Sequence, residues 1–458
     1  MIDDVARVIS RDFEEKHLAR LIRYVRQPSV AATGNGIADM ARLLKEDIDE
    51  LGGDGSVVCG DGFPVVYGRF DVGAARTVLV HSQYDVWPPG AHGWIVDPFS
   101  ASRMNWKGLG DCIVGRGAQD AKCQVALIYN AIEAYRAAGE RLPVNIILVQ
   151  AASVGGHSLA AFVADHPDLF AAVNVAWWPF LTGLPDRRGV VGLGARGLIT
   201  GRMLCSGGEW GGPAESEIHS SNANLVANPA MELIRALLSM DGEAGLDELV
   251  PDARSGDSPP TDEDRALVDR LAEQISSDQL LDILGVAPFD QHDLRAALLD
   301  YCFKSEFTIS ELSAGQVIDG GHKAIVPRSA SASIEVRTGE QVDRLVAGIE
   351  RHLQALHPGV RWQTISKHDA QRLPIRHRAL QQFLGTYADM GIEVQVWPTY
   401  AAGTVRPWTV PIGVPLLIGA PGHGGGNHSA NEYIVVDGFR DACEFGVRLL
   451  HRLGSADG

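Results

Sequence analysis

The alternation of apolar and polar positions divides the first part of the chain into helices and short buried strands. Residues 17–30 repeat apolar side chains at helical spacing up to Pro28, and residues 38–53 predict a second helix that closes at a glycine pair. Continuous apolar runs follow, typical of strands buried on both faces. They are TVLVHS at 77–82, VNIILVQA at 144–151 and AVNVAWW at 172–178, with the helical pattern QVALIYNAIEAYRAAG at 124–139 between them. This order predicts an α/β sheet with helical crossover connections.

The pattern changes after Gly197, where a β-α-β-β-α-β-like unit is predicted. Its helix over 228–240 opens with Asn228 and Pro229, a strong helix start. Residues 328–339 alternate like a half-exposed strand. The predicted segments are therefore an α/β domain over 1–195, an α+β (ferredoxin-like) domain over 196–370 with a polar insertion at about 241–305, and a return to the α/β domain over 371–458.

The composition of the chain excludes some classes of binding partner. The 458 residues carry a net charge of −17, which argues against nucleic acid or an anionic membrane surface. No apolar run is long enough to span a bilayer, and the amphipathic start lacks the pattern of a secretion signal. Six scattered cysteines without a C-x-x-C pair indicate reduced thiols, so a cytoplasmic location is expected.

The stretch HSQYDVWPPG, residues 81–90, has the form of a metal-site loop after a strand, yet Gln83 stands two residues before Asp85 where a metal enzyme would carry histidine. Five further blocks accompany it in order. They are GRGAQDAKC, GLGARGL, EIHSSNANLVANPAMEL, IVPRSASASIEVR and NHSANEYI. Together they resemble the M20 family of di-zinc peptidases and aminoacylases over roughly residues 15–450. The resemblance implies a zinc-peptidase-like α/β sheet between helices, with the inserted domain acting as a lid and dimerisation domain.

In that family one aspartate bridges two zinc ions, and further histidines and carboxylates complete the site. The resemblance places the bridging aspartate on Asp120, a histidine ligand on His428, and the acid that orients the first histidine on Asp85. The first histidine itself falls on Gln83.

The remaining family positions lack ligands. The glutamate pair, which includes the general base, falls on Ala152 and Ser153, and the last aspartate falls near Trp177 and Trp178, whose indoles would fill the space of a cation. Two of five ligand positions survive, so a two-zinc site is not expected. We predict no metal, or a single divalent ion such as zinc on Asp120 and His428; alternatively, these two residues are joined by hydrogen bonds without a metal.

The positions that grip substrate are better preserved. His219 matches the lid histidine that stabilises the oxyanion across a dimer interface, and Arg337 matches the arginine that binds a substrate carboxylate. Gln83, Ser153 and Asn431 are further predicted substrate-binding residues. The resemblance therefore implies a homodimer joined through the lid domains and a small substrate bearing a carboxylate. The alternatives are a surface histidine at 219 and an ordinary ion-paired arginine at 337.

Three other residues are candidates with simpler alternatives. His157 is a replacement ligand or an acid/base group, or else a solvent-facing residue at a helix start. His423 lies five residues before His428 and is a candidate for substrate binding in the same pocket. Cys123 follows a lysine at a helix start, which lowers a thiol pKa and favours a nucleophile; the alternative is a small buried residue.

Three functional interpretations follow. The first is a repurposed enzyme on the M20 scaffold that acts on an amino-acid- or dipeptide-like molecule by non-hydrolytic chemistry, such as amide formation, cyclisation, elimination or isomerisation. The second is a ligand-binding pseudoenzyme without catalysis. The third is an amidohydrolase or peptidase with a rebuilt single-metal site.

Overall fold

The computed structural model describes residues 2–455 apart from 60–61, 91, 153–156, 242–245, 247–248, 250–259, 278–292, 316–322, 340 and 400–411; the side chains of 157–160 are also outside the description. The chain forms two compact units. The first comprises residues 1–194, 372–397 and 404–458, and the second comprises 195–371 and 398–403. The boundaries expected from the sequence, at 195/196 and 370/371, lie next to these changes of unit.

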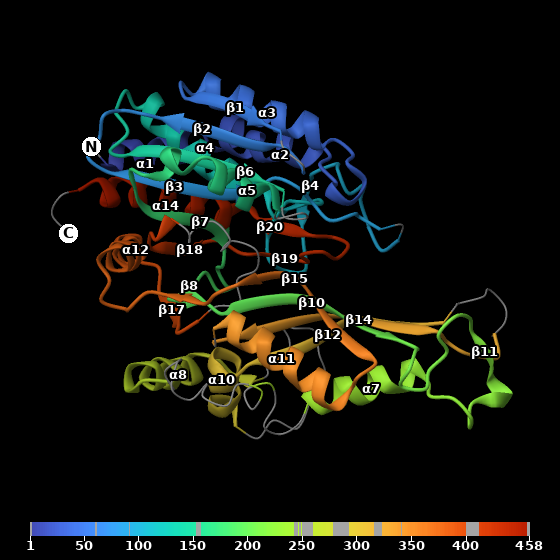
Figure 1. Ribbon diagram of the computed structural model, residues 1–458. Coiled ribbons are helices and arrows are strands. Elements are labelled where there is room, and N and C mark those ends of the chain that lie inside the picture. Colours follow the sequence, from blue (N-terminus) through green and yellow to red (C-terminus); the bar gives the residue numbers. More distant parts are fainter. Residues whose placement is uncertain are drawn as a thin grey trace. The chain divides into compact units, whose positions relative to one another are not determined.

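An eight-stranded mixed sheet forms the centre of the first unit (Figure 1). Its order is β1 (Asp54–Val58), β2 (Val65–Phe70), β6 (Asn145–Ala151), β3 (Thr77–Gln83), β7 (Val173–Leu181), β18 (Leu416–Ala420), β8 (Gly189–Gly192) and β17 (Val394–Trp397). The neighbours β6, β3, β7 and β18 run parallel. Every residue of β3 is buried, which explains its unbroken apolar run.

Helices cover both faces of this sheet. Gly68 of β2 faces Ile48 on one side, whereas its neighbour Tyr67 faces Phe162 on the other. The helices are α1 (Ile2–Arg11), α2 (Ala19–Arg26), α3 (Ile37–Glu50), α4 (Lys122–Ala137), α5 (His157–Asp165), α6 (Pro167–Phe170), α12 (Arg378–Asp389) and α14 (Val436–Gly454), with a π-helical turn over Phe13–Leu18. A second, small sheet joins β19 (Gly424–Gly425), β20 (Tyr433–Val435), β5 (Asp111–Val114) and β4 (Ser102–Asn105). The predicted α/β architecture is confirmed.

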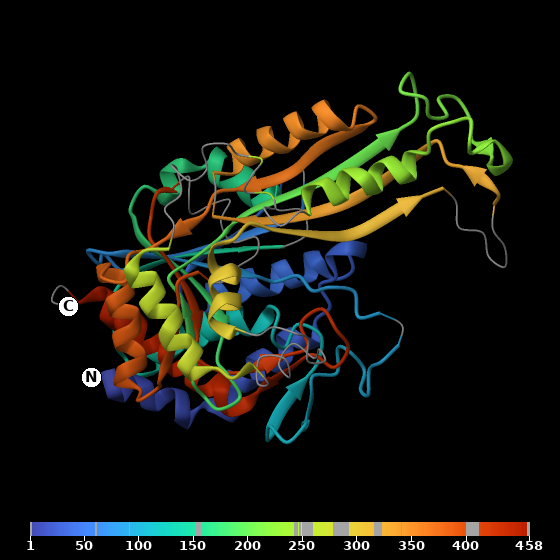
Figure 2. The ribbon, with the colours of Figure 1, turned by 90° about the horizontal axis from the view of Figure 1, so that it is seen from below.

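The second unit is a four-stranded antiparallel sheet in the order β12 (Glu306–Ala314), β14 (Ser329–Thr338), β10 (Gly197–Ser206) and β15 (Val360–His368). The helices α7 (Pro229–Met240) and α11 (Val342–Leu356) pack on one face, as Figure 2 shows. This is the predicted β-α-β-β-α-β arrangement. Alternate residues of β14 are buried under the helices, which matches the alternation seen in the sequence. The core they share includes Ile199, Met203, Leu233, Leu237, Ile334, Leu345 and Ile349.

Local signals fixed the start of α7. The Asn228 side chain accepts a hydrogen bond from the Ala230 N–H at 2.9 Å, and Pro229 is the first helical residue. About half of the predicted insertion at 241–305 lies outside the described residues. Its described parts form α8 (Asp262–Gln274) and α10 (Leu294–Phe303), and the two helices contact each other. Two short strands, β11 (Ile218–His219) and β13 (Ile325–Val326), pair elsewhere in this unit. None of the helices in the described part of the chain combines the length and apolarity that a membrane crossing requires.

Candidate functional site

Asp120 and His428, 308 residues apart in the sequence, are joined by a hydrogen bond in the first unit. His428 Nε2 lies 3.0 Å from Asp120 Oδ2. Asp120 ends the loop before α4, and His428 lies in the loop before β20, where its backbone takes a left-handed φ of 61°. The His428 side chain is 55% exposed and the Asp120 side chain 19%, so the pair is open to small molecules. The two surviving family positions are therefore brought together.

A buried carboxylate, Glu432, holds the Asp120 loop in place. One oxygen accepts from the N–H groups of Gln119 (2.9 Å) and Asp120 (2.7 Å), and the other accepts from the Gly117 N–H (3.0 Å) and Arg116 Nη1 (2.8 Å). Burial raises the pKa of Glu432, and these donors oppose the rise. Four donors on one fully buried carboxylate fix the backbone next to Asp120.

The HSQYDVWPPG stretch contributes an aromatic ring to the same place. The Trp87 ring centroid lies 4.9 Å from that of His428, with an interplanar angle of 43°, and Trp87 is 46% exposed. The sequence interpretation missed this contact, although Trp87 stands inside the stretch that it singled out. Only the fold brings residue 87 beside residue 428.

The beginning of that stretch is buried. Gln83 is the last residue of β3, opposite Ala151 of the parallel strand β6, and Asp85 is buried. Lys122 is also buried, and its Nζ donates to the Gln27 carbonyl. Burial lowers the pKa of Lys122 to about 7, while the charges of Glu432 and Asp85 act in the opposite direction. Asp85 thus acts on a buried lysine.

The lost ligand positions hold no carboxylate and no imidazole. Ala152 is buried after β6, and the predicted substrate residue Ser153 lies outside the described residues. Trp178 donates from Nε1 to Gln124 of α4 at 2.9 Å. Trp177 corrects an expectation: it is fully buried in the core, bonded to the Gly419 carbonyl at 2.9 Å and in ring contact with Phe445 of α14. Because its indole packs in the hydrophobic core of the first unit, Trp177 does not occupy a metal site.

A zinc centre requires a cluster of anionic or imidazole donors, commonly four ligands around each ion. Within the described ranges, no group of three or more histidine, cysteine, aspartate and glutamate side chains is placed to hold a metal ion. Asp120 and His428 supply two donors, and Gln83 adds at best a weak neutral one. The described residues do not fit a two-zinc centre.

Two further predicted residues lie near the site but are engaged by the protein. His423 contacts the Gly183 carbonyl through Nδ1 at 3.0 Å and the Tyr433 hydroxyl through Nε2 at 3.1 Å, and burial lowers its pKa. The Asn431 amide accepts from the Ile95 N–H at 2.8 Å and donates to the Gly93 carbonyl at 2.7 Å. Both side chains stabilise loops in this geometry. A substrate-binding role for either one stays a prediction.

The nucleophile proposed for Cys123 is contradicted. The thiol is fully buried, lies 3.0 Å from the Gln119 carbonyl, and has a pKa raised well above its ordinary value by burial. Such a thiol stays protonated and inert. His157 begins α5, but its side chain is outside the description, so its role stays a prediction.

The predicted lid residues lie in the second unit. His219 is exposed on β11, and its Nδ1 accepts from the Ser221 N–H at 3.2 Å. Arg337 on β14 forms an ion pair with Glu335 of the same strand, with Nη2 and Oε1 2.6 Å apart. The ion-paired alternative therefore describes Arg337 in this state. This contact uses one guanidinium nitrogen and leaves further N–H donors for a substrate carboxylate.

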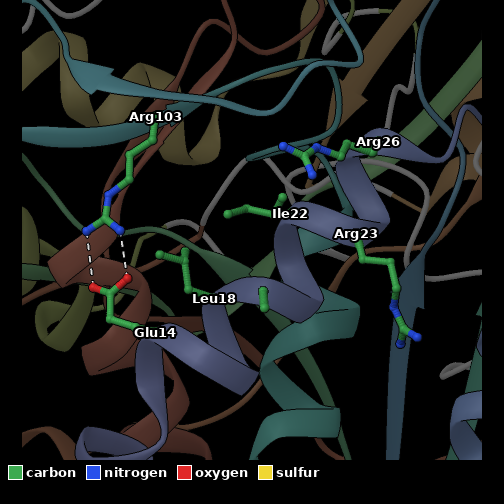
Figure 3. A pocket seen from close by; sticks show the side chains of 7 residues that line it. Glu14, Leu18, Ile22, Arg23, Arg26 and Arg103 are labelled. Atoms are coloured by element: carbon green, nitrogen blue, oxygen red, sulfur yellow. Dashed lines mark hydrogen bonds and ion pairs between the residues drawn. The ribbon is translucent and has the colours of Figure 1, made fainter.

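A separate hollow of about 420 Å³ lies beside α2 (Figure 3). Its lining includes Arg23, Arg26 and Arg103, but none of the predicted site residues. Arg103 is held by both oxygens of Glu14, at 2.6 and 3.1 Å, as well as by Asp111. Because carboxylates of the protein already neutralise most of this positive charge, the hollow is not the candidate site.

Comparison with known proteins identifies the family of the chain. The sequence pattern of Peptidase family M20/M25/M40 matches residues 79–452. The chain belongs to this family. A Cys-Gly metallodipeptidase, DUG1, from Candida albicans is 24% identical over 97% of this chain and 96% of its own length. A Beta-Ala-His dipeptidase from Mus musculus is 23% identical over 61% of this chain and 55% of its own length.

Solved structures of the M20 family share the fold. The metallo-carboxypeptidase Sso-CP2 from Sulfolobus solfataricus superposes with a TM-score of 0.83 at 24% identity, covering 96% of this chain and 99% of its own. The di-peptidase Dug1p from Saccharomyces cerevisiae gives 0.82 at 19% identity, covering 100% and 99%. The predicted family and fold are thus confirmed, and the relatives indicate a hydrolase ancestry.

Proposed function

We propose that this M20-family protein acts on a small amino-acid- or dipeptide-like molecule without the family's two-zinc centre, using Asp120 and His428 as an acid/base pair. The observation that carries the proposal is the 3.0 Å contact between His428 Nε2 and Asp120 Oδ2. Two ligands of one zinc ion, with bonds of about 2.0–2.2 Å, would also lie about 3 Å apart, so the zinc measurement below separates the two cases. The substrate class follows from the relatives, which are named as dipeptidases for Cys-Gly and for β-Ala-His.

The pair has the chemistry of a histidine oriented by a carboxylate. With Nε2 protonated, His428 donates to Asp120 Oδ2, and Nδ1 keeps a lone pair that accepts a proton from substrate. Asp120 then stabilises the imidazolium until the proton is returned. A positioned acid/base group contributes on the order of 10²–10⁴-fold. This suffices for proton abstraction, elimination, cyclisation or isomerisation of an activated substrate, but not for hydrolysis of an ordinary peptide bond.

Two measurements test the proposal. After dialysis against a zinc-containing buffer, the purified protein should hold fewer than about 0.5 zinc ions per chain. Mass spectrometry measures this zinc content. In deuterium oxide, amino-acid amides and dipeptides are followed by NMR for exchange of the α-proton. Exchange by the wild type should fall about 100-fold in His428→Ala, with a matched surface variant, Asp437→Asn, unchanged.

Zinc-dependent hydrolysis of Cys-Gly, together with two zinc ions per chain, would overturn the proposal. One zinc ion that is lost on His428→Ala would favour the single-metal hydrolase. Ligand binding without exchange of any substrate would favour the pseudoenzyme.

We also propose that a second copy of the chain covers an apolar face of the second unit. Met231, Ile234 and Leu238 recur at helical spacing on α7 and remain exposed, and Leu238 is 65% exposed. Ile309 and Leu312 are exposed on β12, which is the edge strand of the sheet. An apolar helix face beside an open strand edge favours self-association. Sedimentation should show a dimer that dissociates in Leu238→Lys; a wild-type monomer at micromolar concentration would contradict this.

A further inference from the structure

Trp87 and Asp120 present unused binding groups next to His428. The Asp120 carboxylate uses Oδ2 for His428, and Oδ1 has no hydrogen-bond partner in the described part of the chain. The Trp87 indole is 46% exposed and rests against the His428 ring. A free carboxylate oxygen and an open indole face thus both border one imidazole.

The charges around the pair leave Asp120 without a lysine or arginine partner in the described part of the chain. Glu432 is paired with Arg116 at 2.8 Å, and the charge of Asp85 acts on Lys122. Among the described residues no lysine or arginine forms an ion pair with Asp120; its one ion-pair contact is His428. The exposed surface beside Trp87 and Asp120 therefore favours a positive charge.

We propose that Trp87 and the free oxygen of Asp120 bind a protonated amine of the substrate, so that Trp87 is a specificity-determining residue for ammonium compounds. The inference rests on the proposed function, since it concerns the same site. An ammonium group donates a hydrogen bond to Oδ1 and lies over the indole, whose π-face attracts cations. A neutral molecule of the same shape gains neither interaction.

A purely structural role for Trp87 predicts a different outcome. If the indole only supported the His428 ring, removal of Trp87 would weaken charged and neutral ligands alike. The cation contact predicts instead that the ratio between the two affinities changes. The comparison of two matched ligands separates these cases.

The experiment uses L-alaninamide, which is protonated at about pH 7 or below, and L-lactamide, in which a hydroxyl replaces the ammonium. Each is titrated into the full-length protein at about pH 6.5, and the His428 Cε1–H signal, assigned by its loss in His428→Ala, is followed by NMR in the wild type and in every variant that keeps His428. Alaninamide should bind at least about tenfold more tightly than lactamide. Trp87→Leu should reduce this ratio by about fivefold, and Asp120→Asn should also reduce it.

Trp87→Phe keeps an aromatic face and should retain most of the preference. Ile95→Ala, an exposed apolar truncation in the loop over 92–98, is the control and should leave both affinities unchanged. Because Trp87 is half exposed, its variants should melt at the wild-type temperature. Equal affinities in the wild type, an unchanged ratio in Trp87→Leu, or no binding of alaninamide at about 50 mM would overturn the inference.

This binding result is independent of the proton-exchange assay. Selectivity for alaninamide with no exchange would leave the ammonium site standing while the acid/base proposal fails. Exchange of neutral substrates without ammonium selectivity would give the opposite result.

Discussion

Replacement of Glu432 by glutamine tests how strongly the candidate site depends on one buried carboxylate. A glutamine keeps the oxygen that accepts from Gln119 and Asp120, but its NH₂ group then faces two donors, the Gly117 N–H and Arg116 Nη1. Two hydrogen bonds to a charged group are lost, each contributing about 1.5–3 kcal/mol. Arg116 is also left buried without its counter-charge, and breaking such a pair costs about 3–5 kcal/mol in total.

Burial raises the pKa of Glu432 because the charged carboxylate loses its hydration on folding, which costs free energy. A neutral amide avoids part of this desolvation cost. We therefore expect Glu432→Gln to lower the free energy of unfolding of the first unit by about 3 kcal/mol. Urea denaturation followed by fluorescence measures the loss. Asp437→Asn, the same chemical change in an exposed ion pair with Arg440, should cost less than about 0.5 kcal/mol.

The double variant Arg116→Met/Glu432→Gln sharpens the test, because it removes the unpaired charge as well. It should recover at least about 1 kcal/mol relative to Glu432→Gln alone. A loss below about 1 kcal/mol in the single variant would refute the argument that this carboxylate anchors the Asp120 loop.

Two further predictions concern stability. His81 is fully buried with its pKa lowered to about 4, so the folded state binds its proton less readily than the unfolded state; stability should fall as the pH drops from about 6.5 toward 4, by up to about 3 kcal/mol. Thermal melts across this range should be flatter for His81→Asn, and an equal slope in both proteins would exclude His81 as the cause. Asn228→Ala removes the cap of α7 and should cost the second unit about 1 kcal/mol, whereas Asn228→Ser should keep most of it; equal losses in the two variants, measured by urea denaturation, would contradict a capping role.

The sequence allowed the elements with strong local signals to be predicted. The apolar run of β3, the cap of α7 and the alternation of β14 each arise within a few residues, and six ordered motifs identified the family. The edge strand β1, largely exposed and without an apolar run, carried no such signal. The insertion of β18 between β7 and β8 depends on pairing between distant segments, which no local pattern records.

For the candidate site, too, features within a local motif could be predicted, whereas features that depend on tertiary packing could not. Asp120 and His428 were predicted because they stand in motifs, and their contact is present. The ring contact of Trp87 with His428 and the burial of Trp177 in the core depend on tertiary packing. Cys123 was considered as a nucleophile because of its neighbours in sequence, but complete burial determines its chemistry.

Because the chain is synthesised from the N-terminus, the order of synthesis determines when the Asp120–His428 site can form. Glu432 gathers donors from residues 116–120, and β18 completes the parallel strands begun by β6, β3 and β7. A nascent chain that ends before residue 416 has therefore made the whole antiparallel sheet of the second unit, while the first unit still lacks both an inner strand and the anchor of its Asp120 loop. Truncation from the C-terminus should therefore abolish the Asp120–His428 site long before it affects the second unit.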